Sequence, residues 1–172
     1  MPYWQLFYHL VWSTANREPL LTPDVEPIVY GFLRSKAIGL GGIVFALNGT
    51  LDHVHMVCAI PPSIAVAKFV GQIKGVSATR FNKLGTRETP LYWQGEYGAF
   101  SFDAKRLAQV VAYVERQKEH HAQGGLIPIL ERTSEGGVGL MREPTAEYTT
   151  GYDDWGRRCW RWSRLNMAIQ SD

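Results

Sequence analysis

The sequence predicts an α+β fold in which an antiparallel sheet carries helices on one face. The first observation is the element order, because segments of strand and helix periodicity alternate as β-α-β-β-α-β-α along the chain. The second is a hairpin signal, Asn48-Gly49, between two apolar runs. Together they indicate a sandwich of ferredoxin-like type.

The first half of the chain supplies a strand, a helix and the hairpin. Residues 3–14 have aromatic and branched side chains at both odd- and even-numbered positions, which is typical of a strand covered on both faces. A helix is predicted over residues 22–39 with Thr22 as its N-cap, and Pro27 is compatible with it only in the first turn. Residues 42–60 form the two arms of the hairpin.

The second half supplies two helices and one strand. A helix is predicted over residues 63–82, and residues 90–102 look like a strand that Gly95 and Gly98 interrupt. A third helix spans about residues 103–123, and a glycine pair ends it.

Length and composition are those of one domain with an appendage. The chain has 172 residues, of which 45% are hydrophobic, so it can bury a core. No apolar run approaches the roughly 18 to 20 residues of a membrane span, and the N-terminus lacks the features of a signal peptide. The two cysteines, Cys58 and Cys159, form no disulfide or metal framework, so we expect a reduced, cytoplasmic setting.

The composition changes near residue 132. Residues 1–131 are the predicted domain, and residues 132–172 begin with a Gly/Pro-rich linker and end by interleaving three tryptophans with four arginines. This tail either anchors back on the domain by its aromatic rings or contacts unpaired bases, on which indole and guanidinium groups stack.

A local excess of positive charge indicates a surface for phosphate groups. The net charge is only +2, but residues 63–87 contain five basic residues and no acidic one. The five are Lys68, Lys74, Arg80, Lys83 and Arg87. The alternatives are a solvated helix face and a surface that binds the nucleic-acid backbone.

The segment LDHVHMVCAIPP, residues 51–62, places two histidines two positions apart on a predicted strand. Alternate side chains of a strand share a face, so His53 and His55 should point the same way. Such a pair binds a divalent metal ion or is a polar pair on a solvated face. On the third helix, Tyr113 and Gln117 stand one turn apart at the edge of the apolar stripe. Helix spacing alone favours an ordinary boundary tyrosine and a solvated glutamine over a functional pair.

In this order and at this spacing, the motifs resemble the single-tyrosine HUH transposases of simple insertion sequences and their domesticated relatives associated with REP palindromes. HVH lies on a strand, a lysine-bearing helix follows, and YVERQ lies on a late helix. YHLVWSTANREPLL is similar to the family's opening strand, and WQGEYGAFSF to the segment before its tyrosine helix. The resemblance covers about residues 3–123.

The resemblance implies a metal-dependent transposase or endonuclease that acts on single-stranded DNA beside a hairpin. His53, His55 and Gln117 would hold Mg²⁺ or Mn²⁺, and Tyr113 would be the nucleophile that forms a 5′-phosphotyrosine. It further implies a homodimer, a bacterial, nucleoid-associated location and DNA contacts by the basic residues, with no membrane partner. Whether the tyrosine helix reaches its own histidine strand or that of a partner stays open.

Three other functions stay open as well. They are a domesticated REP-type single-strand nuclease, a non-catalytic protein that binds hairpin DNA or RNA, and a metal-dependent phosphoesterase for small molecules. The last would explain the histidines but not the tyrosine.

Among the remaining polar residues, Asp52 is interpreted as a hairpin cap rather than a partner of a histidine, and His9 as structural. His120 and His121 are interpreted as solvated, with a fourth metal ligand or a proton shuttle as alternatives.

Overall fold

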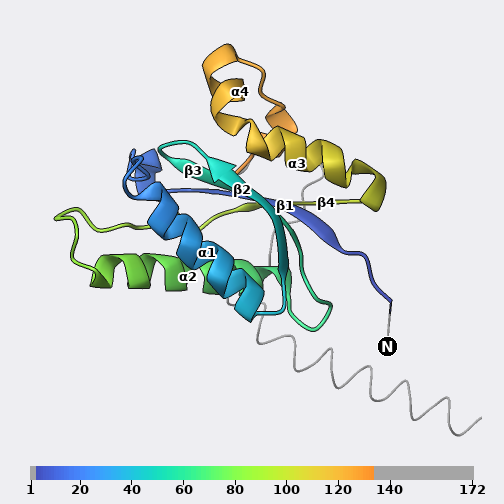
Figure 1. The fold of residues 1–172 in the computed structure, drawn as a ribbon, viewed down its shortest axis with the longest axis horizontal. Helices are drawn as coiled ribbons and strands as arrows, with labels where there is room; N and C mark the ends of the chain where they lie inside the picture. The colour runs from blue at the N-terminus through green and yellow to red at the C-terminus, as the bar shows by residue number, and fades with distance from the viewer. Residues whose placement is uncertain (1–2, 134–172) are drawn as a thin grey trace, which may run out of the picture. The chain divides into compact units, whose positions relative to one another are not determined.

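A four-stranded antiparallel sheet forms the centre of the fold, in a computed structural model that describes residues 3–133 (Figure 1). The strands are β1 (Phe7–Ser13), β2 (Ile43–Gly49), β3 (His53–Ala59) and β4 (Gly98–Phe102), in the spatial order β2-β3-β1-β4. All of their pairings are antiparallel. The predicted α+β class and antiparallel sheet are therefore confirmed.

Helices cover both faces of this sheet. α1 (Glu26–Gly39) and α2 (Val66–Lys83) pack on one face, whereas α3 (Leu107–Glu115) and α4 (Gln117–Gln123) lie on the other (Figure 1). Pro27 lies in the first turn of α1, where a missing N–H does no harm. The prediction that the helices share one face is therefore wrong for the last part of the domain.

The alternation of side chains along β3 explains this arrangement. Its even-numbered residues point into the larger core beneath α1 and α2. Val57 points the other way and packs against Val110 and Val114 of α3. Removing such side chains from water stabilises a fold by roughly 25 cal/mol per Å². His53 and His55 share the parity of Val57, so they face α3 and α4.

Two elements are shorter than predicted. The segment 90–102 is a strand only over β4, with an isolated bridge between Thr14 and Trp93 upstream. The helix predicted over residues 103–123 begins with a 3-10 turn and is interrupted at Arg116, whose ψ of 17° is not helical. Both irregularities shape the site described below.

The C-terminal extension lies mostly outside the described residues. Residues 1–136 form one unit of the chain and residues 137–172 a second. The predicted linker and Trp/Arg-rich tail, residues 132–172, are described only at Arg132 and Thr133, so both stay predictions. In the described part of the chain, no helix is long and apolar enough to cross a bilayer.

Lys74 is a structural residue. Its side chain is buried, and its ammonium donates hydrogen bonds to the backbone carbonyls of Gln94 (2.6 Å), Gly95 (3.2 Å) and Glu96 (3.1 Å). Burial lowers the pKa of Lys74 to about 8. Because the ammonium ties the loop before β4 to α2, it does not face a DNA phosphate, and the prediction of Lys74 as a DNA contact is corrected.

Replacing Lys74 by methionine should destabilise the protein. Methionine keeps the apolar stem but leaves three carbonyls without their donor, and a buried polar group left unpaired costs about 1–3 kcal/mol. We expect the free energy of unfolding to fall by about 2–4 kcal/mol, with a Tm lower by several degrees in a circular dichroism melt. Lys68→Met, at an exposed position of the same helix, is the matched control and should melt like the wild type. Equal melting of the two variants would contradict this role.

Candidate active site

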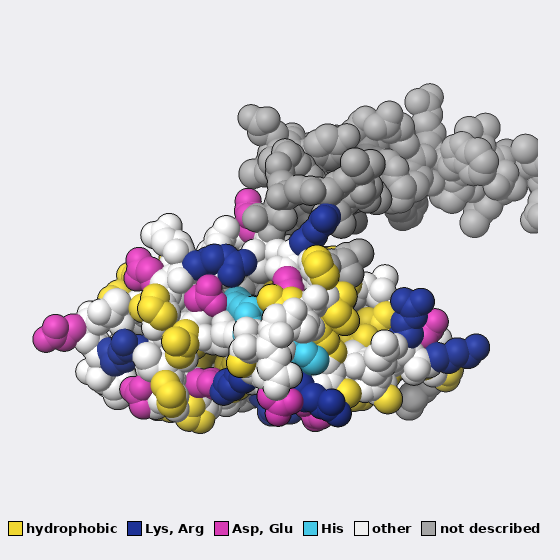
Figure 2. Space-filling view, turned by 90° about the horizontal axis from the view of Figure 1, so that it is seen from above, with side chains coloured by type: hydrophobic (Ala, Val, Ile, Leu, Met, Phe, Trp, Pro, Cys, Tyr) yellow, Lys and Arg dark blue, Asp and Glu magenta, His cyan; other side chains and the backbone are white. Residues whose placement is uncertain are grey.

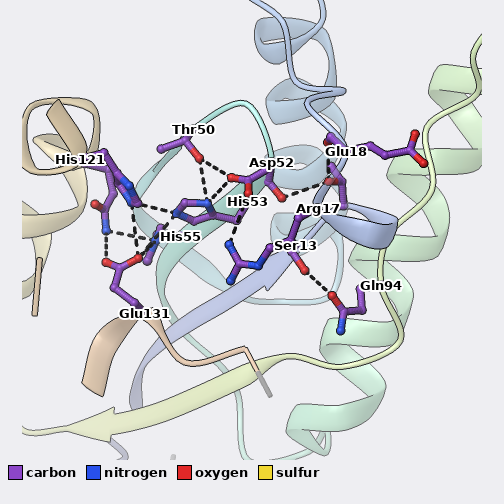
Figure 3. Close-up of polar contacts among 12 residues, drawn as sticks. Ser13, Arg17, Glu18, Thr50, Asp52, His53, His55, Gln94, His121 and Glu131 are labelled. Carbon is purple, nitrogen blue, oxygen red and sulfur yellow. Dashed lines mark hydrogen bonds and ion pairs between the residues drawn. The ribbon is translucent and has the colours of Figure 1, made fainter. Parts of the chain in front are cut away.

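Two histidines on β3 form the base of the site. His53 is 3% exposed and His55 is fully buried. Their ring centroids lie 5.0 Å apart, and both rings face the same side of the sheet (Figure 3). The expectation of a common face is confirmed, and the alternative of a solvated polar pair is excluded because neither ring is exposed.

Each histidine is oriented by a contact at its Nδ1 atom. Nδ1 of His53 lies 2.6 Å from Oδ1 of Asp52 and 2.7 Å from Oγ1 of Thr50 (Figure 3). Nδ1 of His55 lies 2.9 Å from Nε2 of His9, a fully buried residue of β1. Both Nε2 atoms are thereby directed into the site. The interpretations of Asp52 as only a cap and of His9 as only structural miss this orienting role.

The interruption between α3 and α4 brings the tyrosine helix onto the histidine strand of its own chain. Asn48 of β2 donates a hydrogen bond of 2.8 Å to the backbone carbonyl of Glu115, which ties the end of α3 to the sheet. Gln117 then starts α4, and its fully buried Nε2 lies 3.1 Å from Nε2 of His55. Tyr113, 7% exposed, lies one turn earlier on the same side.

Glu131 joins the histidines to the tyrosine. One carboxylate oxygen, Oε2, lies 3.3 Å from Nε2 of His55 and 3.6 Å from Nε2 of His53. The other, Oε1, accepts hydrogen bonds from the hydroxyl of Tyr113 (2.5 Å) and the amide of Gln117 (2.8 Å). No sequence pattern singled Glu131 out, because it comes from a short 3-10 helix after α4 with no periodicity to mark it.

His121 of α4 completes a cluster of potential metal ligands. His121 is exposed, as interpreted from the sequence, but its Nε2 lies 3.1 Å from Nε2 of His53, so it also contacts the site. The ligand atoms of His53, His55, His121 and Glu131 all lie within 4.8 Å of one another. Gln117 fits the same site, because its Oε1 is buried without a hydrogen-bond partner, and exchanging the two ends of the amide would turn this oxygen toward the histidines. Imidazole, amide and carboxylate donors in this arrangement suit a divalent cation.

Burial and hydrogen bonding set the charges of the site. Burial lowers the pKa of His55 and of His121, which favours the neutral imidazole that binds metal ions. Burial alone would raise the pKa of Glu131, but the hydrogen bonds with His53 and His55 outweigh it and hold this pKa well below its usual range. Burial, and after it the hydrogen bond to Glu131, raises the pKa of Tyr113 to about 12.

Acid should destabilise the protein through His9. Burial lowers the pKa of His9 to about 3, against 6.5 for a free histidine. Below about pH 6.5 the unfolded chain therefore binds a proton that the folded protein does not, and the free energy of unfolding falls as the pH drops toward 3.

At about pH 4.5 this group alone lowers the free energy of unfolding by about 2–3 kcal/mol. Urea denaturation at about pH 7.5 and about pH 4.5 measures the loss. It should be smaller by that amount in His9→Gln, and an identical loss in both proteins would contradict the role of His9.

The predicted basic surface is only partly available. Three of its residues have exposed side chains on α2: Lys68, Arg80 and Lys83. Arg87 instead donates a hydrogen bond of 3.0 Å to the backbone carbonyl of Leu20, and Lys74 is buried. On the face of α3 and α4, histidine side chains lie between basic and acidic ones (Figure 2).

Comparison with known proteins identifies the family. The family model described as IS200-like transposase matches residues 2–117. The ISDra2 transposase TnpA of Deinococcus radiodurans is 30% identical over 121 residues, which are 67% of this chain and 86% of that protein. The IS200 transposase of Salmonella typhimurium is 24% identical over 132 residues, which are 73% of this chain and 86% of that protein.

Solved structures share the fold. A transposase candidate from Deinococcus radiodurans superposes with a TM-score of 0.55 at 28% identity, over 68% of this chain and 95% of that one. A REP-associated tyrosine transposase bound to a REP hairpin superposes with a TM-score of 0.53 at 14% identity, over 84% and 100% of the two chains. Fold and sequence together define a DNA transposase. The chain belongs to the IS200-like transposase family.

Proposed function

We propose that the protein cleaves and rejoins single-stranded DNA next to a hairpin, with Tyr113 as the nucleophile. One observation carries this proposal. The hydroxyl of Tyr113, the two histidines of β3 and the amide of Gln117 meet at the carboxylate of Glu131, within one chain of a transposase family. The hairpin bound by a structural relative supports the choice of substrate.

The proposed reaction is a transfer of one phosphodiester. The oxygen of Tyr113 attacks the scissile phosphorus, a bond between them forms, and the bond from phosphorus to the 3′-oxygen breaks. The phenol loses its proton and the departing 3′-oxygen gains one, which leaves a 5′-phosphotyrosine and a free 3′-hydroxyl. Attack by another 3′-hydroxyl reverses the step and rejoins strands without ATP. Because the pKa of Tyr113 is about 12, removal of the phenol proton is part of the barrier.

The proposed metal ligands are His53, His55 and Gln117. Glu131 and His121 are proposed as further donors, because their ligand atoms lie within 4.8 Å of those of both histidines. A bound Mg²⁺ or Mn²⁺ would withdraw negative charge from the attacked phosphate. Imidazole ligands favour Mn²⁺ of the two.

The proposed DNA contacts are the exposed basic residues of α2, namely Lys68, Arg80 and Lys83. Contacts of this kind make binding salt-dependent. A homodimer and a nucleoid-associated, cytoplasmic location stay proposals that the resemblance implies.

The experiment that tests the proposed function is covalent trapping. The protein is mixed with labelled single-stranded oligonucleotides that span the hairpins flanking its gene, in Mn²⁺ or in EDTA. We expect a denaturant-resistant adduct that forms only with the metal ion. Hairpin binding without an adduct, under any metal, would contradict the proposal and favour a non-catalytic hairpin-binding protein.

His9→Leu should weaken the binding of Mn²⁺. Leucine removes the group that fixes Nδ1 of His55, and loss of such an outer partner costs about 10- to 100-fold in metal affinity. His9→Gln should restore most of the affinity, because its side-chain oxygen accepts the hydrogen bond from Nδ1. Calorimetric titration of the DNA-free protein measures both constants. Wild-type affinity in the leucine variant would show that His9 does not orient the ligand.

A further inference from the structure

A cavity of about 550 Å³ lies beside the histidine cluster, and the proposed reaction uses none of the residues that line it. Its walls are the turn Ala15–Arg17 after β1, the segment Trp93–Gly95 before β4, and Thr133. The two backbone segments run side by side, joined by the bridge between Thr14 and Trp93. The cavity is therefore part of the sheet framework that carries the histidines.

Two chains of contacts connect the cavity to the histidines. Ser13 pairs with His53 across β1 and β3, and its hydroxyl donates a hydrogen bond of 2.6 Å to Oε1 of Gln94 on its other side (Figure 3). Since neighbouring strands lie about 4.8 Å apart, Gln94 is about 10 Å from His53. Arg17 lies 3.3 Å from Oδ2 of Asp52, which in turn orients His53. If a DNA phosphate is bound at the histidines, this short distance puts a neighbouring nucleotide of the same strand within reach of the cavity.

The lining groups suit a nucleobase. Asn16, Arg17 and Gln94 supply these groups, whereas the indole of Trp93 turns toward α2, where its Nε1 donates a hydrogen bond of 3.0 Å to Ser77 and its ring packs edge-on against Trp12. A guanidinium group such as that of Arg17 can stack on an unpaired base. The side-chain amides of Asn16 and Gln94 each offer a donor and an acceptor that can pair with a base edge.

The cavity is held rigidly. Asn16 and Arg17 both have positive φ, 53° and 55°; asparagine adopts this conformation readily, whereas it is unfavourable for arginine. The hydroxyl of Ser13 fixes the amide of Gln94, and the ammonium of Lys74 holds the carbonyl of the same residue. Pre-organised groups lose less freedom when a ligand binds.

We infer that this cavity binds one unpaired base of the DNA strand, next to the scissile phosphate, and that Gln94 selects which base it is. The inference rests on the proposed function, because it takes single-stranded DNA as the substrate. It assigns part of the sequence preference to a protein pocket.

The test is to sequence the DNA that becomes attached to the protein. Wild-type protein and Gln94→Ala are each mixed with hairpin oligonucleotides whose single-stranded flanks are randomised. The phosphotyrosine marks the scissile phosphate, so every base is counted from it. Gln72→Ala, on a helix of the opposite face, is the matched control.

We expect the wild type and the control to prefer one base at one flanking position. Gln94→Ala should relax this preference at least about fivefold and leave other positions unchanged. An unchanged base profile in Gln94→Ala, with the adduct still formed, would overturn the inference and leave the proposed function intact. No adduct with the wild-type protein would overturn both.

Discussion

Tyr113→Phe should abolish the covalent adduct with DNA and leave hairpin binding nearly unchanged. The substitution removes the one oxygen that can form the phosphotyrosine at this position, while the ring keeps its packing against Val57 and α3. The lost hydroxyl also donates to Glu131 and accepts from the backbone N–H of Ile127 (3.1 Å), so a modest change in stability is expected. Denaturing gels of labelled DNA measure the adduct, and fluorescence anisotropy measures binding.

Tyr92→Phe is the matched control for this experiment. Tyr92 is 60% exposed in the segment before β4, and its phenylalanine variant should form the adduct at the wild-type rate. A denaturant-resistant adduct in Tyr113→Phe would reject this residue as the nucleophile. A thermal melt shows whether Tyr113→Phe is still folded. Loss of the reactive oxygen alone should leave both the melt and hairpin binding intact, whereas loss of the fold should remove both.

The sequence predicted those parts of the site that depend on local periodicity. The shared face of His53 and His55 follows from the two-residue repeat of a strand, whatever the rest of the fold does. The single turn between Tyr113 and Gln117 follows similarly from helix spacing. The interruption at Arg116 was not predicted, because neither proline nor glycine marks it and the contact from Asn48 to the end of α3 depends on tertiary packing.

The orienting groups could not be predicted, because they depend on long-range register. In the pairing of β1 with β3, His9 is opposite Val57 and Val11 is opposite His55, so the two histidines meet only as diagonal neighbours. A shift of one residue would move His9 to the other face of the sheet. Glu131 lies even further along the sequence from His55, and it reaches β3 only because the short 3-10 helix after α4 lies against the site. The sequence also placed α3 and α4 on the wrong face of the sheet. The apolar stripe of a helix shows that it packs on a sheet, but it does not determine on which face.

His55→Ala should remove both the binding of Mn²⁺ and the metal-dependent adduct. His55 is the proposed ligand held at both ends, by His9 at Nδ1 and by Gln117 and Glu131 at Nε2, and burial lowers its pKa so that the neutral imidazole is favoured. Loss of a direct ligand should exceed the roughly 100-fold that loss of an outer partner can cost. Calorimetry with Mn²⁺ measures the first effect, and the trapping assay in Mn²⁺, with EDTA as the blank, measures the second.

His120→Ala is the control, because it removes an imidazole from α4 that lies outside the cluster of four potential ligands. It should bind Mn²⁺ as the wild type does, even though His120 stacks on Tyr113 with centroids 4.9 Å apart. If His55→Ala stays folded and still binds Mn²⁺ with wild-type affinity, the histidine pair does not hold the metal ion. Its contacts to Glu131 would then serve only to position that carboxylate against Tyr113. Loss of Mn²⁺ binding together with retained hairpin binding would instead separate the metal site from the DNA-binding surface, as expected if α2 on the opposite face contacts the DNA backbone.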